Sequence, residues 1–139
     1  MKYLVLLLAF IGATAFADGF KVGLGGHCPV GFVMAGKPII GDPKFSSEYQ
    51  GVTYYSSSAE AKTMFDKEPG KYVDAIRYKG YCATGLAMGK QIESDPSLFS
   101  RVDGKVYFFS SKEAKAMFDK EPKKYIGMAD KEWTKLSQK

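Results

Sequence analysis

The sequence has few of the residues on which catalysis and nucleic-acid binding usually depend. It contains one histidine, His27, and two cysteines in 139 residues. The histidine is next to Cys28, and neighbouring side chains usually diverge, so a Cys–His nucleophilic pair is not expected. The only arginines, Arg77 and Arg101, are too far apart for the basic cluster of a nucleic-acid groove. We therefore expect a non-enzymatic protein with no nucleic-acid partner.

Long apolar runs are also scarce, and the one that exists is at the N-terminus. Lys2 precedes an almost wholly apolar stretch over residues 3–11, and Ala15-Phe16-Ala17 follows, with small residues where a signal peptidase reads. This pattern predicts a secretory signal peptide over residues 1–17. The stretch is too short to cross about 30 Å of hydrocarbon comfortably, which disfavours an anchor. We expect cleavage after Ala17 and a periplasmic or secreted protein without a membrane span in its mature chain.

The remaining composition is that of a small globular protein. Apolar residues make up 45% of the chain, charged residues 25% and aromatic residues 14%, which excludes a disordered chain. The length excludes a large multidomain enzyme. The formal net charge of the whole chain is +5, of which Lys2 contributes one. Basic and acidic residues alternate along the sequence, as on a mixed, solvated surface.

The sequence contains an internal duplication with a period of about 50 residues. Residues 65–69 (FDKEP) recur as residues 118–122, a shift of 53 positions. Cys28 corresponds to Cys82 with a shift of 54. One residue has therefore been inserted or lost between the glycine that follows the cysteine in each repeat (Gly31 and Gly85) and the next lysine. We divide the chain into a signal peptide (1–17), an N-terminal lead-in (18–24), a first repeat (25–77), a second repeat (78–130) and a C-terminal helical tail (131–139), for which Asp130 is the expected N-cap.

Each repeat is predicted to form a β-hairpin followed by a helix. Asp103-Gly104 lies between two β-forming runs and is a strong signal for a two-residue hairpin turn, which needs positive φ. Gln50-Gly51 takes the same place in the first repeat. One repeat buries too little apolar surface to be stable alone. The expected fold is therefore α+β, with both repeats packed as one pseudo-twofold unit around a shared core that buries Phe65 and Phe118.

These motifs together resemble the YHS domain family. The first repeat is similar to the family pattern in Cys28-Pro29-Val30, in the aromatic pair Tyr54-Tyr55, and in Pro69 followed by Tyr72. The second repeat resembles the Gly-Tyr-Cys form of exported tandem YHS proteins over residues 80–90 (GYCATGLAMGK). The resemblance covers nearly the whole mature chain, and it implies that the protein handles heavy metals.

The sequence also departs from this family. Metal-binding members place one cysteine at the end of the aromatic strand and another a few residues into the helix. Near those places this chain has Ser57 and Ala61 in the first repeat, and Ser110 and Ala114 in the second. Serine and alanine cannot replace thiolate in holding a soft metal, so the fuller cysteine site of the family is absent.

The two cysteines leave three possibilities open. An even number of cysteines in an exported protein suggests a disulfide, and a Cys28–Cys82 bond would make the chain a structural or interaction module. Such a bond contributes about 4 kcal/mol in the chain-entropy model. Alternatively, Cys28, Cys82, His27, Met34 and Met88 form a soft-metal site, because thiolate, imidazole and thioether ligands favour Cu(I). The third possibility is two free thiols without a ligand.

Overall fold

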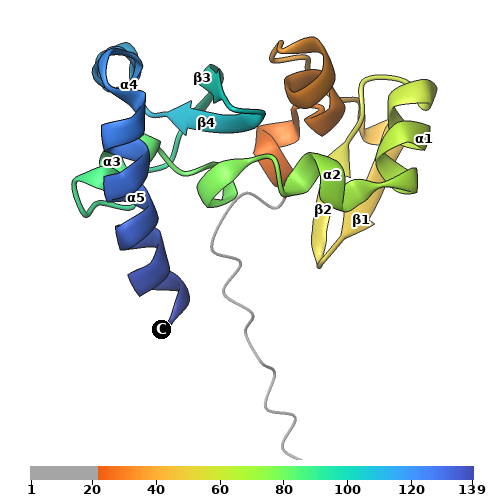
Figure 1. The fold of residues 1–139 in the computed structure, drawn as a ribbon. Coiled ribbons are helices and arrows are strands. Elements are labelled where there is room, and N and C mark those ends of the chain that lie inside the picture. The colour runs from red at the N-terminus through yellow and green to blue at the C-terminus, as the bar shows by residue number, and fades with distance from the viewer. Residues whose placement is uncertain (1–21) are drawn as a thin grey trace, which may run out of the picture.

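The protein has a mixed α+β fold, as expected, with two small antiparallel two-stranded sheets and several helices (Figure 1). The computed structural model describes residues 22–139, so the predicted signal peptide lies outside the described residues. None of the helices in the described residues combines the length and the apolarity needed to cross a bilayer. In chain order the elements are η1 (Gly23–Gly26), η2 (Gly31–Ala35), η3 (Pro43–Phe45), β1 (Ser46–Tyr49), β2 (Val52–Tyr55), α1 (Ala59–Lys67), α2 (Pro69–Val73), η4 (Arg77–Gly80), α3 (Ala83–Ala87), β3 (Asp95–Val102), β4 (Lys105–Phe109), α4 (Lys112–Lys120) and α5 (Pro122–Ser137).

Each hairpin is closed by the turn that the sequence predicts. β1 pairs with β2 across Gln50-Gly51, and β3 pairs with β4 across Asp103-Gly104. The four turn residues all have positive φ, from 49° to 77°. Positive φ at both central positions gives the hairpin a backbone twist that matches the twist of its strands. The two predicted turns are therefore confirmed.

A serine caps the helix that follows each hairpin. Ser58 at the start of α1 and Ser111 at the start of α4 each accept a backbone N–H through Oγ at 3.1 Å. Such a bond pairs one of the donors that the first turn of a helix leaves free. Pro69 and Pro122 follow the ends of these helices, and each also opens the next one, because proline is tolerated at the first helical position.

The C-terminal helix is longer than expected. α5 runs from Pro122 to Ser137 without interruption, so the predicted tail over residues 131–139 is the second half of this helix. Asp130 was expected to cap a separate helix, but it lies inside α5. Its side chain caps no helix and instead accepts hydrogen bonds from Arg77 and Tyr78 of η4, far away in the sequence.

The buried residues form three clusters. The first cluster contains Phe65 and Cys28, and the second contains Phe118 and Cys82. A third set, which we call the bridging cluster, consists of Phe32, Ile76, Val106 and Phe108 and takes residues from both halves of the chain. Figure 1 shows α1 and α2 beside β1 and β2 on one side of the molecule, and α3, α4 and α5 near β3 and β4 on the other. The expected shared core is therefore divided, and the bridging cluster joins its two parts.

Left-handed backbone conformations recur in the two halves. Leu24 and Gly25 in η1 have φ near 58°, and Tyr78 and Lys79 in η4 have φ of 55° and 51°. A residue other than glycine held in this region costs about 1–3 kcal/mol, so surrounding contacts must hold it there. In η4 those contacts come from the buried Tyr78 side chain, which is anchored on α5.

Candidate functional site

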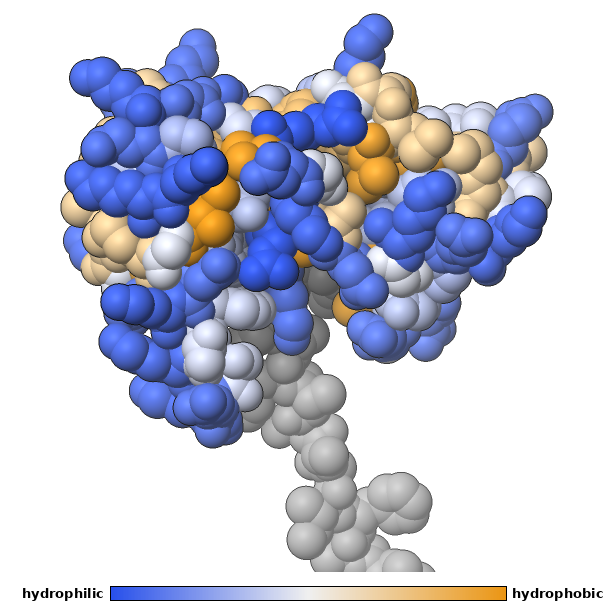
Figure 2. All heavy atoms as spheres, viewed as in Figure 1, coloured by the Kyte–Doolittle hydropathy of each residue, from blue (hydrophilic) through white to orange (hydrophobic). Residues whose placement is uncertain are grey.

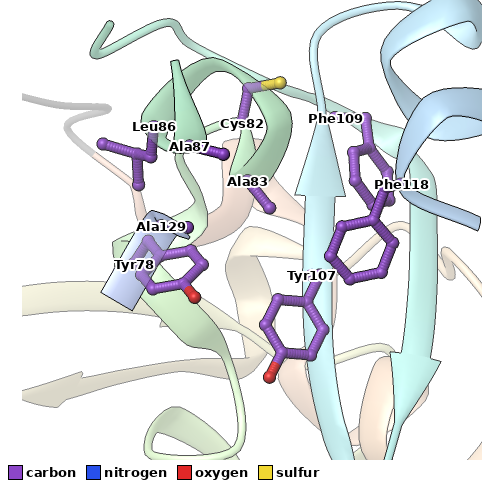
Figure 3. Packing of buried hydrophobic residues seen from close by; sticks show 9 residues of the cluster. All are labelled: Tyr78, Cys82, Ala83, Leu86, Ala87, Tyr107, Phe109, Phe118 and Ala129. Atoms are coloured by element: carbon purple, nitrogen blue, oxygen red, sulfur yellow. The ribbon is translucent and has the colours of Figure 1, made fainter. Parts of the chain in front are cut away.

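Both cysteines are free thiols without exposed surface, and they lie in different clusters. Cys28 belongs to the first cluster with Tyr54 and Phe65. Cys82 belongs to the second cluster with Phe118, and Figure 3 shows the rings of Tyr107, Phe109 and Phe118 side by side along β4. The two cysteines, which the sequence pattern aligns with each other, therefore lie in separate clusters and form no disulfide.

The Cys82 sulfur is held by neighbours from its own half of the chain. Its Sγ accepts the backbone N–H of Gly85 and the hydroxyl of Ser110, each at 3.4 Å. Thr84 Oγ1 donates to the Ala114 carbonyl at 2.7 Å, so the start of α3 lies against α4. Ser110 and Ala114 are the positions near which the resemblance places additional cysteines. The sequence pattern aligned Cys82 with Cys28 and gave no indication of the contact between Cys82 and Ser110.

The other three predicted ligands are not gathered around a cysteine. His27 Nδ1 lies 3.2 Å from the Leu24 carbonyl, and its ring packs 5.9 Å from that of Phe32. Met34 and Met88 are 54% and 61% exposed, whereas both thiols are fully buried. Among residues 22–139, no group of three or more His, Cys, Asp or Glu side chains is placed to hold a metal ion.

Two similar polar clamps fasten α1 and α4 to their hairpins. Asp66 on α1 accepts hydrogen bonds from Lys62 and from Ser47 on β1. Both bonds lower the pKa of the Asp66 carboxyl, and the bond from Lys62 has the larger effect. Asp119 on α4 accepts from Lys115 and from Ser100 on β3 in the same way, 53 residues later. Because each carboxylate is paired within the fold, the clamps are structural ties between helix and strand.

A network that sequence reasoning missed joins η4 to α5. Asp130 Oδ1 accepts the Tyr78 hydroxyl at 2.7 Å and Arg77 Nη2 at 3.1 Å. The Trp133 ring lies 5.9 Å from that of Tyr78, one turn further along α5. Burial, and then the bond to Asp130, raise the pKa of the Tyr78 hydroxyl. No local sequence pattern indicates this network, because its partners lie more than 50 residues apart.

The raised pKa of Tyr78 predicts that the protein loses stability in alkaline solution. An unfolded tyrosine titrates near pH 10, and the pKa of Tyr78 is raised above that value in the fold. The unfolded state loses this proton first, so the contribution of the Tyr78 hydroxyl to the free energy of unfolding is complete below pH 10. Above that pH, stability falls by up to about 1.4 kcal/mol per pH unit from this group. Denaturant unfolding between pH 9 and about pH 11 measures the slope.

The matched variant for this measurement is Tyr78→Phe. It keeps the aromatic ring and removes the titrating hydroxyl, while Tyr54 and Tyr107, whose pKa values burial also raises, remain in both proteins. The variant should therefore lose less stability per pH unit than the natural protein. Equal slopes for the two proteins would contradict the assignment to Tyr78.

Large apolar side chains are exposed at corresponding places in both halves. Isolated apolar residues on a surface are common and need no explanation, but recurrence at equivalent positions is more informative. Six of the nine large apolar side chains that the described residues expose occur in such pairs. The pairs are Met34 and Met88 (54% and 61% exposed), Ile39 and Ile92 (37% and 39%), and Met64 and Met117 (both 39%).

Comparisons with known proteins found no relative. No family model, no curated protein and no solved structure matches this chain. The function is therefore inferred from the residues of the chain and their geometry.

Proposed function

We propose that this chain is an exported, non-enzymatic binding module built from two YHS-like repeats. The signal-peptide pattern over residues 1–17 supports its export to the periplasm or the medium. The hairpin turns, serine caps and polar clamps, which recur at the spacing of the duplication, support the two repeats. In this proposal a rotation close to twofold relates the repeats, and the bridging cluster fills their contact.

The observation that carries the binding function is the paired exposure of apolar side chains. Met34 and Met88 each keep more than half of their surface in solvent, so folding gains little from either. Nevertheless both halves retain an apolar residue there, and also at the positions of Ile39 and Ile92. Exposed apolar side chains grouped on a surface are typical of sites that a partner covers. A binding module accounts for apolar side chains that the fold itself leaves exposed.

Metal handling and a disulfide staple receive less support. Both need the sulfurs of Cys28 and Cys82 to meet, whereas the two residues belong to different clusters. Met34 and Met88 are also more than half exposed, whereas both thiols are fully buried. The residue beside Cys82 is Ser110, which supplies a hydroxyl in place of a second thiolate.

A copper(I) titration of the reduced protein tests this proposal. Each thiol is buried in its own cluster, so we expect the folded protein to retain no copper against a strong Cu(I) chelator such as bathocuproine disulfonate. The variants Cys28→Ser and Cys82→Ser should behave as the natural protein does. Retention of about one Cu(I) per chain, abolished in Cys82→Ser, would contradict the proposal and support metal handling.

A further inference from the structure

The most exposed large apolar side chain in the described residues is Ile40, with 74% of its surface in solvent. It lies at the end of residues 34–40, a segment in which every residue except Gly36 is exposed. Figure 2 shows hydrophobic and near-neutral residues gathered where Figure 1 draws the brown segment that carries η2. We call the exposed residues of this segment the 34–40 patch: Met34, Ala35, Lys37, Pro38, Ile39 and Ile40.

The backbone of the 34–40 patch is tied down. Gly36 takes φ of 62° and reverses the chain at the end of η2. Hydrogen bonds of 2.8–3.2 Å then connect Lys37, Ile39 and Gly41 to backbone groups in residues 26–31. The apolar side chains are therefore held outward by a fixed backbone, because the segment cannot fold them back without breaking these bonds.

Positive charge lies at the edge of the patch. Lys37 is one of its members, and Arg101 on β3 donates from Nη2 to the Val33 carbonyl at 3.1 Å, which brings its guanidinium beside Gly36. The acid that follows the patch, Asp42, accepts the backbone N–H of Lys44 at 2.9 Å. The patch therefore presents an apolar centre and two cations.

We infer that the 34–40 patch docks the protein on the surface of an anionic lipid bilayer. Apolar side chains of this kind enter the headgroup boundary, while adjacent lysine and arginine meet anionic headgroups. A stable protein complex needs about 20–30 residues on each side, many more than this patch supplies. A bilayer requires no matching shape, and its charge complements that of the patch. The inference rests on the proposed binding module and names its partner.

The second half of the chain carries a matched segment with a different charge. Met88 and Ile92 correspond to Met34 and Ile39, but the position of Ile40 is taken by the exposed Glu93. A carboxylate there repels an anionic surface and resists burial among lipid tails. We therefore assign the docking surface to the first half only. The substitution Ile40→Glu copies a residue that the second half already accommodates.

Vesicle sedimentation of the exported protein tests the inference. The vesicles contain phosphatidylcholine, with or without about one third phosphatidylglycerol, at moderate ionic strength. We expect binding to the anionic vesicles only, and Ile40→Glu should weaken it about tenfold or more. Lys37→Gln should lower binding and make it less sensitive to salt. Met88→Ser is the control in the second half, and it should bind as the natural protein does.

Several results would overturn the inference. Equal binding by the natural protein and Ile40→Glu would show that another segment attaches the chain to lipid. Equal binding to neutral and anionic vesicles would remove the role of charge. A protein dimer that Ile40→Glu dissociates would make the patch a contact between copies. If vesicles are not bound and copper is not retained, the lipid bilayer is the wrong partner, while the proposed binding module stands. Retention of copper contradicts the binding module itself.

Discussion

Replacing Phe108 by alanine should lower the free energy of unfolding by about 3–5 kcal/mol, the range for buried phenylalanine. Phe108 is 2% exposed, and its ring lies 4.9 Å from that of Phe32, edge to face. The substitution leaves a cavity in the bridging cluster, where the two halves of the chain meet. We expect the natural protein to unfold in a single transition, and the variant, in which each half keeps only its own cluster, to unfold in two.

Two spectroscopic signals resolve these transitions. Trp133 is the only tryptophan in the sequence and packs in the second half, so its fluorescence reports on that half alone. Circular dichroism reports on the helices of both halves. Phe65→Ala is the matched control, because it removes the same side chain from the first cluster and leaves the bridging cluster intact. Coincident fluorescence and dichroism curves in Phe108→Ala would contradict the coupling role of Phe108.

Both thiols should resist chemical modification until the protein opens. Cys28 and Cys82 have no exposed surface, so a disulfide reagent reaches them only through local or global unfolding. Opening a core of this kind costs several kcal/mol, which slows the reaction by a factor of about 10³ or more relative to the unfolded chain. Stopped-flow reaction with dithionitrobenzoate, with and without denaturant, measures this factor.

The same reagent counts the thiols. Protein purified and denatured without reductant should show two thiols per chain, because both cysteines are free. Ser110→Ala removes the hydroxyl that donates to the Cys82 sulfur, so Cys82 should be modified faster than before while Cys28 is unchanged. Absence of free thiols before reduction and their appearance afterwards would contradict the separate burial and support the disulfide staple.

Local chemistry made much of the secondary structure predictable. The hairpin turn at Asp103-Gly104 depends on residues that tolerate positive φ, and the cap at Ser111 depends on one hydroxyl three residues before the N–H it accepts. Such interactions span only a few residues, so they can be recognised without knowledge of the fold. The expected burial of Phe65 and Phe118 is also confirmed.

Contacts between distant segments were not predictable to the same degree. The sequence suggested a separate final helix at Asp130, but that residue lies inside α5 and bonds to Tyr78 and Arg77, 52 and 53 positions away. Nothing in the local pattern indicates such a partner, because hydrogen bonds of this range depend on how η4 and α5 pack. The nearness of Ser110 to Cys82 is another contact of this kind.

The sequence by itself determined the hairpins and the helix starts, and it predicted that Cys28 and Cys82 are equivalent. Only the tertiary structure decided how far the two halves merge and where the sulfurs lie. Equivalent residues of a duplicated chain meet only if they lie close to the axis that relates the copies. In this protein the bridging cluster joins Phe32 to Phe108, which are not equivalent positions of the two repeats. Each cysteine is packed among aromatic residues of its own half.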